Sequence, residues 1–325
     1  MDKKTRVKNA FDKKPVDHAP VGFWIHFFDK MDDEEAMVKA HIDYHSALDF
    51  DIAKLMSDGL FAFPLDGLEI KTPSDLLKIR PIEANHPWIR AQVKRIQTIK
   101  GILGGDKFYL FNLFAPFTSL KLNMPDEQIM QYARENKAEL RYALDVVARG
   151  GALLGEKLIC EAGCDGVYFA VQSGEYTRFT EAEYADLLTP GELFVLEHCN
   201  RYSGYNIMHC CGFYDNKNRM SLWRDYPAKC LNWATAVEEL SLSEGRYFFG
   251  NKAVMGGFDT HWGMDSTEEQ RGILYHGSKE ELQAYTRELI LNTGKLGTII
   301  GGDCTVDHRI DIERLKWIVE AVRSM

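Results

Sequence analysis

The chain has 325 residues, of which 45% are hydrophobic and 27% are charged, and its formal net charge is −9. This length and composition are typical of a globular domain with a large core, and they exclude a disordered chain. The negative charge, without a local cluster of Lys and Arg, argues against nucleic acid and anionic membranes as partners.

The sequence also argues against membrane insertion and secretion. No stretch approaches the ~18 consecutive apolar residues of a membrane helix. The basic N-terminus is followed by Asp17 and His18 and not by the apolar region of a secretory signal. The seven cysteines are odd in number and lie within apolar runs, which favours a reducing compartment. We therefore expect a cytoplasmic protein.

Eight short runs rich in β-branched and aromatic residues recur along the chain, separated by segments with helical periodicity. These runs are 19–24, 51–56, 107–114, 165–171, 205–211, 229–233, 252–258 and 297–302. Such alternation is typical of a parallel sheet. It predicts a single α/β domain over residues 1–325 folded as a (β/α)8 TIM barrel, with an open doubly wound sheet as the alternative.

The segments between the runs carry signals of helix starts and of one insertion. Capping-box spacing, in which Ser or Thr is followed three residues later by Glu, occurs at Thr180 and Glu183, Ser266 and Glu269, and Ser278 and Glu281. The segment 61–106 after the second strand is long and interrupted by prolines. We expect it to be an irregular insertion that lies over one end of the barrel.

Residues whose side chains can bind metal or take part in catalysis lie where the predicted strands end. They are His26, Asp58, Gln172, His209, Cys211, Asn232, Asp259 and Cys304. In barrel enzymes the loops after the strands converge at the carboxyl ends, where the active site lies. These positions therefore predict one site at the barrel mouth.

The fifth strand and the cysteine after the eighth predict a metal site. Alternation along a strand places His209 and Cys211 on one face and turns Cys210 toward the surrounding helices. In a closed barrel Cys304 can approach the same ion from the opposite wall. Two thiolates and one imidazole suit Zn²⁺, and three protein ligands leave the open position of a catalytic site.

Other interpretations stand beside these assignments. A single cysteine is more often a small core residue than a ligand, which is how we interpret Cys160, Cys164, Cys199, Cys210 and Cys230. Asp58 and Asp259 can cap the turns that follow them, and His26, Gln172 and Asn232 can be structural. As site residues, we expect Asp58, Gln172 and Asp259 to be catalytic, and His26 and Asn232 to bind substrate.

Several motifs together resemble the uroporphyrinogen decarboxylase (URO-D) superfamily across nearly the whole chain. They are RVKNAFDKKPVDHAPVGFW, DGVYFAVQSGEYTRFTEAEY, HCCG, LNW, GGFD and the closing GGDC. The resemblance implies a distorted (β/α)8 barrel, in agreement with the strand count. Decarboxylases of this superfamily carry an R-Q-A-G-R motif after the first strand and G-H-G after the last. This chain has Ile25 to Phe28 and Gly302 to Cys304 at those places.

The corrinoid-linked methyltransferase branch is marked by H-x-C and a distant cysteine that bind zinc, and His209, Cys211 and Cys304 match that pattern. The resemblance implies methyl transfer from a methylcorrinoid such as methylcobalamin, delivered by a corrinoid carrier protein, to a thiol or other acceptor. Its rivals are a URO-D-type decarboxylase with Asp58 as acid/base group, and a non-catalytic barrel that binds a corrinoid or tetrapyrrole. Asp303, Asp259, Glu175 and water all stay open as the fourth zinc ligand.

Overall fold

The computed structural model of the protein describes residues 1–212, 216–260 and 272–325. The helix start predicted at Ser266 and Glu269 lies outside these ranges.

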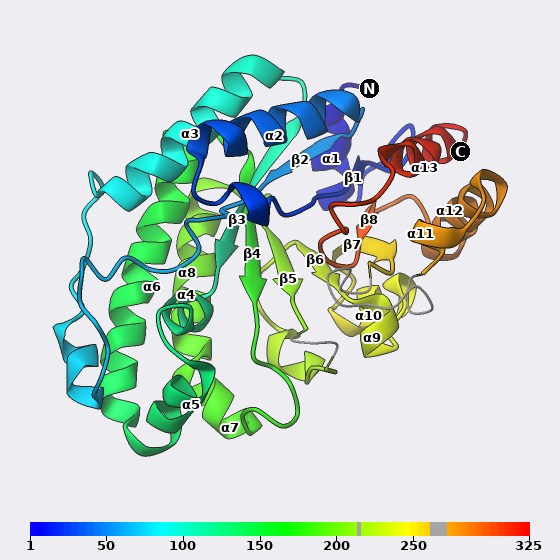
Figure 1. The fold of residues 1–325 in the computed structure, drawn as a ribbon. Helices are drawn as coiled ribbons and strands as arrows, with labels where there is room; N and C mark the ends of the chain where they lie inside the picture. The colour runs from blue at the N-terminus through cyan, green and yellow to red at the C-terminus, as the bar shows by residue number, and fades with distance from the viewer. Residues whose placement is uncertain (213–215, 261–271) are drawn as a thin grey trace.

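All eight predicted runs form strands of one parallel sheet (Figure 1). The strands are β1 (Val21–Gly22), β2 (Ile52–Leu55), β3 (Phe108–Phe114), β4 (Gly166–Val171), β5 (Ile207–Cys210), β6 (Cys230–Trp233), β7 (Ala253–Phe258) and β8 (Thr298–Gly302). Their spatial order is β1-β8-β7-β6-β5-β4-β3-β2, without the reversal that a doubly wound sheet requires. The predicted (β/α)8 TIM barrel is confirmed, and the doubly wound alternative is excluded.

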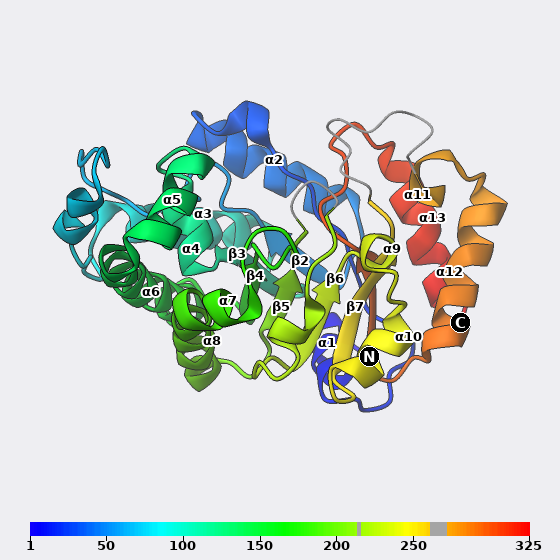
Figure 2. The ribbon, with the colours of Figure 1, turned by 90° about the horizontal axis from the view of Figure 1, so that it is seen from below.

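Helices follow the strands and form an outer ring, as the view from below shows (Figure 2). The α-helices are α1 (Lys3–Phe11), α2 (Glu34–Ala47), α3 (Pro87–Leu103), α4 (Pro116–Lys121), α5 (Asp126–Glu135), α6 (Lys137–Cys160), α7 (Glu181–Leu187), α8 (Thr189–Tyr202), α9 (Thr235–Glu238), α10 (Leu242–Phe248), α11 (Ile273–His276), α12 (Lys279–Thr293) and α13 (Ile312–Arg323). Three 3-10 turns are η1 (Phe28–Lys30), η2 (Pro73–Lys78) and η3 (Met220–Trp223). The capping boxes predicted at Thr180 and Ser278 begin α7 and α12.

The barrel closes between β1 and β2 through side-chain and backbone contacts of Asp51. The Asp51 amide donates to the Val21 carbonyl at 3.0 Å, and the Val21 amide donates to Asp51 Oδ2 at 2.8 Å. A Cβ on Gly22 would lie 2.8 Å from the Ile52 Cβ, so only glycine lets the two strands approach this closely. Arg6 Nη1 of α1 donates to Asp51 Oδ1 at 2.5 Å, which connects α1 with the closure between β1 and β2.

Alternation along the strands separates the barrel interior from the outer layer. An interior cluster contains Ile52, Met56, Phe108, Leu110, Tyr168, Ile207 and Met255, together with Val7, Ala10 and Phe11 of α1. Helix α1 therefore fills the amino end of the barrel. On β5, Met208 and Cys210 belong instead to the outer core against the helices. The prediction that Cys210 turns away from the interior is confirmed.

The segment after β2 corrects one expectation. Residues 87–103 are not irregular but form α3, because Pro87 occupies its first turn and Ile89, Val93, Ile96 and Ile99 repeat with helical spacing on its buried face. The preceding irregular part packs beside α6, while Phe61 at its start contacts the rings of His26 and Phe28 at the barrel mouth. A Cβ on Gly150 of α6 would meet the side chains of Phe63 and Ile82.

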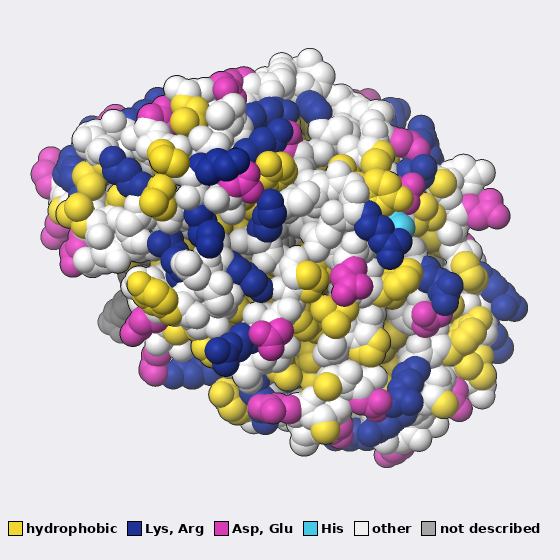
Figure 3. All heavy atoms as spheres, turned by 180° about the vertical axis from the view of Figure 1, so that it is seen from behind, with side chains coloured by type: hydrophobic (Ala, Val, Ile, Leu, Met, Phe, Trp, Pro, Cys, Tyr) yellow, Lys and Arg dark blue, Asp and Glu magenta, His cyan; other side chains and the backbone are white. Residues whose placement is uncertain are grey.

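Most cysteines assigned to the core are there. Cys164, Cys199, Cys210 and Cys230 are buried, but Cys160 is exposed at the end of α6, which corrects its assignment. No helix within the described ranges has the length and apolar character to cross a membrane. On the face shown in Figure 3, basic and acidic side chains are interspersed.

Candidate metal centre

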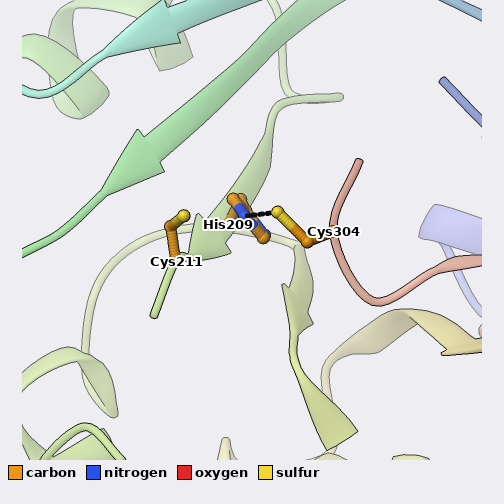
Figure 4. A group of neighbouring side chains, drawn as sticks. All are labelled: His209, Cys211 and Cys304. Atoms are coloured by element: carbon orange, nitrogen blue, oxygen red, sulfur yellow. Dashed lines mark hydrogen bonds between the residues drawn. The ribbon is translucent and has the colours of Figure 1, made fainter. Parts of the chain in front are cut away.

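The structure brings together the three predicted metal ligands. His209 lies on β5, Cys211 directly follows that strand, and Cys304 follows β8 on the other wall (Figure 4). One ligand atom from each residue lies within 4.8 Å of the other two, and His209 Nε2 is 3.6 Å from Cys304 Sγ. His209 and Cys211 are buried, and Cys304 is partly buried.

Neighbouring groups shift the acidity of the two thiols in opposite directions. The hydrogen bond with Cys304, the adjacent His209 and the Gln172 side chain lower the pKa of Cys211 against the effect of burial. The same pairing with Cys211, together with burial, raises the pKa of Cys304. Gln172 Nε2 donates to Cys211 Sγ at 3.5 Å. Two sulfurs that compete for one proton favour a cation between them.

The donor set fits a zinc ion. Tetrahedral zinc with sulfur at about 2.3 Å and nitrogen at about 2.0 Å separates its ligand atoms by roughly 3.5–3.8 Å, and the 3.6 Å between His209 Nε2 and Cys304 Sγ falls in this range. Within the described ranges, the His209–Cys211–Cys304 group is the cluster of His, Cys, Asp and Glu side chains able to hold a metal. His209 Nδ1 is buried without a hydrogen-bond partner, whereas metal-bound histidines usually donate from this second nitrogen.

The three carboxylates considered as a fourth ligand differ in burial and in hydrogen bonding. Both oxygens of Asp303 are engaged, since Gly257 N and Thr235 N donate to them at 2.8 and 2.7 Å, and burial raises the pKa of Asp303 to about 6. Asp259 follows β7 and is half-buried. Glu175 is buried, and neither of its carboxylate oxygens has a hydrogen-bond partner. None of the three carboxylates joins the close donor group.

His26 and Asp58 form a second cluster at the same end of the barrel. His26 Nδ1 lies 2.6 Å from Asp58 Oδ1, and the Phe27 amide donates to Asp58 Oδ2 at 2.7 Å. Burial opposes ionisation of Asp58, but the hydrogen bond and charge of His26 lower its pKa. The His26 ring stacks on Phe28 with 4.5 Å between ring centroids. Asp58 is fully buried, so His26 is the member of the pair that can meet a substrate.

Asn232 lies inside the barrel and not at its surface. Its Nδ2 donates to Met255 O at 2.9 Å and to Gly302 O at 3.1 Å, and its Oδ1 accepts from Tyr168 Oη at 2.5 Å. These bonds hold β4, β6, β7 and β8 together beneath the metal centre. The geometry favours a positioning role, and the predicted contact of Asn232 with substrate stays a prediction.

Sequence reasoning missed the floor of the site. Trp24, Lys54 and Tyr168 fill the barrel below His209, and the rings of Trp24 and Tyr168 lie 6.4 and 5.4 Å from the His209 ring. Lys54 Nζ lies over both of these aromatic rings. The available signal was the alternation of Ile52, Lys54 and Met56, which places a lysine on the interior face of β2.

Known proteins were compared with this chain by sequence and by structure. A search of curated protein sequences finds no match. Among solved structures, a methyltransferase from Methanosarcina mazei is similar over 100% of this chain and 98% of its own, with a TM-score of 0.78 and 17% identity. A B12-independent methionine synthase from Shewanella sp. W3-18-1, in complex with selenomethionine, is similar over 95% and 94%, with a TM-score of 0.55 and 13% identity.

At these identities the structural similarity shows a shared fold. The sequence profile of the family "Uroporphyrinogen decarboxylase (URO-D)" matches residues 2–325, nearly the entire chain. The profile match and the barrel agree with the motifs at the strand ends. The chain belongs to the uroporphyrinogen decarboxylase (URO-D) family.

Proposed function

We propose that this protein is a zinc-dependent methyltransferase that moves a methyl group from a methylcorrinoid to a thiol. The observation that carries the proposal is the donor set of His209 Nε2, Cys211 Sγ and Cys304 Sγ, gathered within 4.8 Å at the barrel mouth. A set of three protein ligands leaves one position for a substrate, as in catalytic zinc sites. The similarity in fold to a methyltransferase is consistent with this proposal.

Zinc held there would act as a Lewis acid that converts a thiol into a thiolate at neutral pH. His209, Cys211 and Cys304 hold the ion, and the Gln172 amide orients the Cys211 sulfur through its hydrogen bond. His26 offers a place for the proton that the thiol releases, because Asp58 holds its Nδ1 and leaves the other ring nitrogen able to accept.

The donor and acceptor define the rest of the reaction. In this proposal the thiolate sulfur would form a bond with the methyl carbon, and the cobalt–carbon bond of the donor would break with its electron pair left on cobalt. A large corrinoid would approach across the barrel mouth, so we propose delivery by a separate corrinoid carrier protein.

Two measurements test this function. The purified protein should contain close to one zinc per chain, and X-ray absorption at the zinc edge should show an added sulfur at about 2.3 Å when the correct thiol binds. Methyl transfer from free methylcobalamin should require the metal. Equal transfer by metal-free protein would contradict the proposal.

The decarboxylase chemistry that gives the family its name provides the second test. This chain has no arginine in Ile25 to Phe28 to pair with the carboxylates of a tetrapyrrole. Unpaired carboxylates entering the mouth would lose hydration without compensation. Uroporphyrinogen should therefore be a poor substrate, and its ready conversion to coproporphyrinogen would overturn the methyltransferase assignment.

A further inference from the structure

Lys54 is a lysine inside the barrel to which the reaction above gives no role. It stands on β2 between Ile52 and Met56, which belong to the interior core, and its side chain is 4% exposed. Its Nζ lies 3.6 Å from the ring centroid of Tyr168 and 3.8 Å from that of Trp24. No described residue accepts a hydrogen bond from Nζ or forms a salt bridge with it.

Opposing influences act on the charge of the Lys54 head group. Burial lowers the pKa of Lys54 well below its usual range, and negative charge on Cys304, Cys211 and Asp58 acts in the opposite direction. Two aromatic faces attract an ammonium ion through their quadrupoles, and this attraction is strongest when the cation is desolvated. The Asp58 carboxylate is engaged by His26 and Phe27, so an anion bound at the metal centre is the counter-charge that the Lys54 ammonium lacks.

The same two rings connect Lys54 with the metal centre. Tyr168 and Trp24 contact the Lys54 ammonium on one side, and their rings lie 5.4 and 6.4 Å from the His209 ring. Lys54 is therefore one aromatic layer away from the donor set. At this separation, in a site shielded from bulk water, a unit charge acts strongly on other charges.

The net charge of the metal centre indicates which kind of fourth ligand Lys54 can favour. A divalent ion with two thiolates and a neutral imidazole has no net charge, so the fourth ligand determines whether the centre is neutral or negative. We propose that Lys54 makes the His209–Cys211–Cys304 centre select an anionic fourth ligand over a neutral one. This inference rests on the proposed function, because it requires a divalent ion at these three residues.

Such selection separates the substrate of the proposed reaction from its product. A thiol enters the open position as a thiolate with one negative charge, while its proton leaves to a base or to solvent. The methylated product is a neutral thioether. Lys54 therefore attracts the sulfur before methylation and gives no comparable attraction afterwards, which favours product release.

Ligand titrations of the cobalt(II)-substituted protein test the selection. Azide and hydrosulfide serve as anionic probes and imidazole as a neutral probe, with binding followed by the visible absorption of cobalt. In Lys54→Met the affinity for both anions should fall about tenfold or more, as expected for unit charges within ~10 Å at an effective dielectric constant of about 20. Affinity for imidazole should change less than about twofold, and Lys54→Arg should retain most of the preference for anions.

Lys107 provides a matched control because it is a second buried lysine at the start of β3, away from the barrel mouth. Its Nζ donates to Leu48 O at 2.8 Å and Phe50 O at 3.2 Å. Lys107→Met should leave the ratio of azide to imidazole affinity unchanged. Equal weakening of all three probes in Lys54→Met, or no weakening of the anions, would overturn the role of Lys54.

The outcomes distinguish this inference from the function on which it rests. If wild-type protein binds no divalent metal, both fail. If the metal binds and Lys54→Met loses its preference for anions, but methylcobalamin transfers no methyl group, only the methyltransferase proposal fails.

Discussion

The two halves of the barrel mouth are built in opposite ways. In the sulfur half, formed by β5 and the segment after β8, three ligand atoms face one another, and His209 Nδ1 is buried without a partner. In the histidine–aspartate half, after β1 and β2, both oxygens of Asp58 and Nδ1 of His26 already have partners. The first half presents three ligand atoms suited to an ion, whereas the hydrogen bonds of the second are made within the protein.

The side chains of the two halves are therefore held in place by different contacts. The sulfur half should depend on metal, since an ion would bridge its three ligand atoms. The histidine–aspartate half should depend on hydrogen bonds and on the folded barrel. Variants and pH should therefore separate the two halves.

The largest effect should come from removing a sulfur ligand. Cys211→Ser or Cys304→Ser should lower zinc affinity by about a thousandfold or more, because a hydroxyl is a far weaker zinc ligand than a thiolate. Metal content after dialysis against a competing chelator measures the change. Cys210→Ser is the matched control, since Cys210 packs in the outer core. Similar zinc loss in that variant would show that the ligand assignment on β5 is wrong.

Acid should weaken the side of the barrel that carries the histidine–aspartate half. His41 is buried behind β2, where its Nε2 accepts from the Met56 amide at 3.0 Å, and burial lowers its pKa from 6.5 to about 4. Because the unfolded chain binds the proton first, stability is intact above pH 6.5 and is lost as pH falls toward 4. The loss should be about 3 kcal/mol.

Urea unfolding at several pH values measures this contribution of His41. His41→Gln should unfold with a correspondingly shallower dependence on pH between 6.5 and 4. An identical slope in the variant and the wild type would assign the acid sensitivity to other groups, of which the neighbouring buried His45 is the first to test.

Glu192, in the helix layer beside the sulfur half, should make stability depend on pH with the opposite sign. Glu192 on α8 is fully buried and accepts from Tyr184 Oη and Tyr226 Oη, each at 2.7 Å, and burial raises its pKa from 4.5 to about 7. Tyr184 also contacts the Gln172 carbonyl, which links Glu192 with Cys211. Stability is full below pH 4.5 and decreases by about 3 kcal/mol as pH rises toward 7, because the unfolded carboxyl ionises first.

Glu192→Gln retains hydrogen-bonding groups without the titrating proton. The difference in unfolding free energy between wild type and variant should therefore shift with pH between 4.5 and 7.5. A constant difference across that interval would refute the assignment to Glu192.

The histidine–aspartate pair should matter for rate more than for metal. Asp58→Asn removes the carboxylate that orients His26, so methyl transfer should decrease about ten- to a hundredfold. Zinc content should be unchanged, because neither residue belongs to the donor group. Loss of zinc in Asp58→Asn would contradict the separation of the two halves.

The strand ends show how far the sequence predicts this site. The eight apolar runs place His209, Cys211 and Cys304 at the mouth, because alternation and barrel closure are properties of the backbone. The partnership of His26 with Asp58 depends on loop conformation after two strands, which periodicity does not encode. Asn232 sits at a strand position that suits both a substrate contact and its observed bonds within the barrel.

Alternation along β2 places Lys54 on the interior face, but the usual behaviour of lysine argues against that position. Lysine is rarely buried without a paired charge, so the alternation alone did not single it out. Its environment is created by Trp24, which follows β1, and by Tyr168 of β4. Helix α3 was missed for a simpler reason, since prolines before and at its first turn concealed its helical spacing.

The smallest effect should come from the single hydrogen bond between Gln172 and the sulfur half. Gln172 Nε2 donates to Cys211 Sγ at 3.5 Å, and its Oε1 accepts from Thr118 Oγ1 at 3.3 Å. One such bond is worth about 0.5–1.5 kcal/mol, so Gln172→Ala should weaken zinc binding or methyl transfer only about three- to tenfold. Gln172→Glu sharpens the test, because a carboxylate cannot donate to the sulfur and places negative charge beside it. If the amide acts by donation, the Glu variant should be at least as impaired as the Ala variant at neutral pH, in metal competition assays and in transfer assays alike. A Glu variant that equals the wild type would mean that Gln172 fills space beside Cys211 and that the sulfur half orders its ligands without this bond.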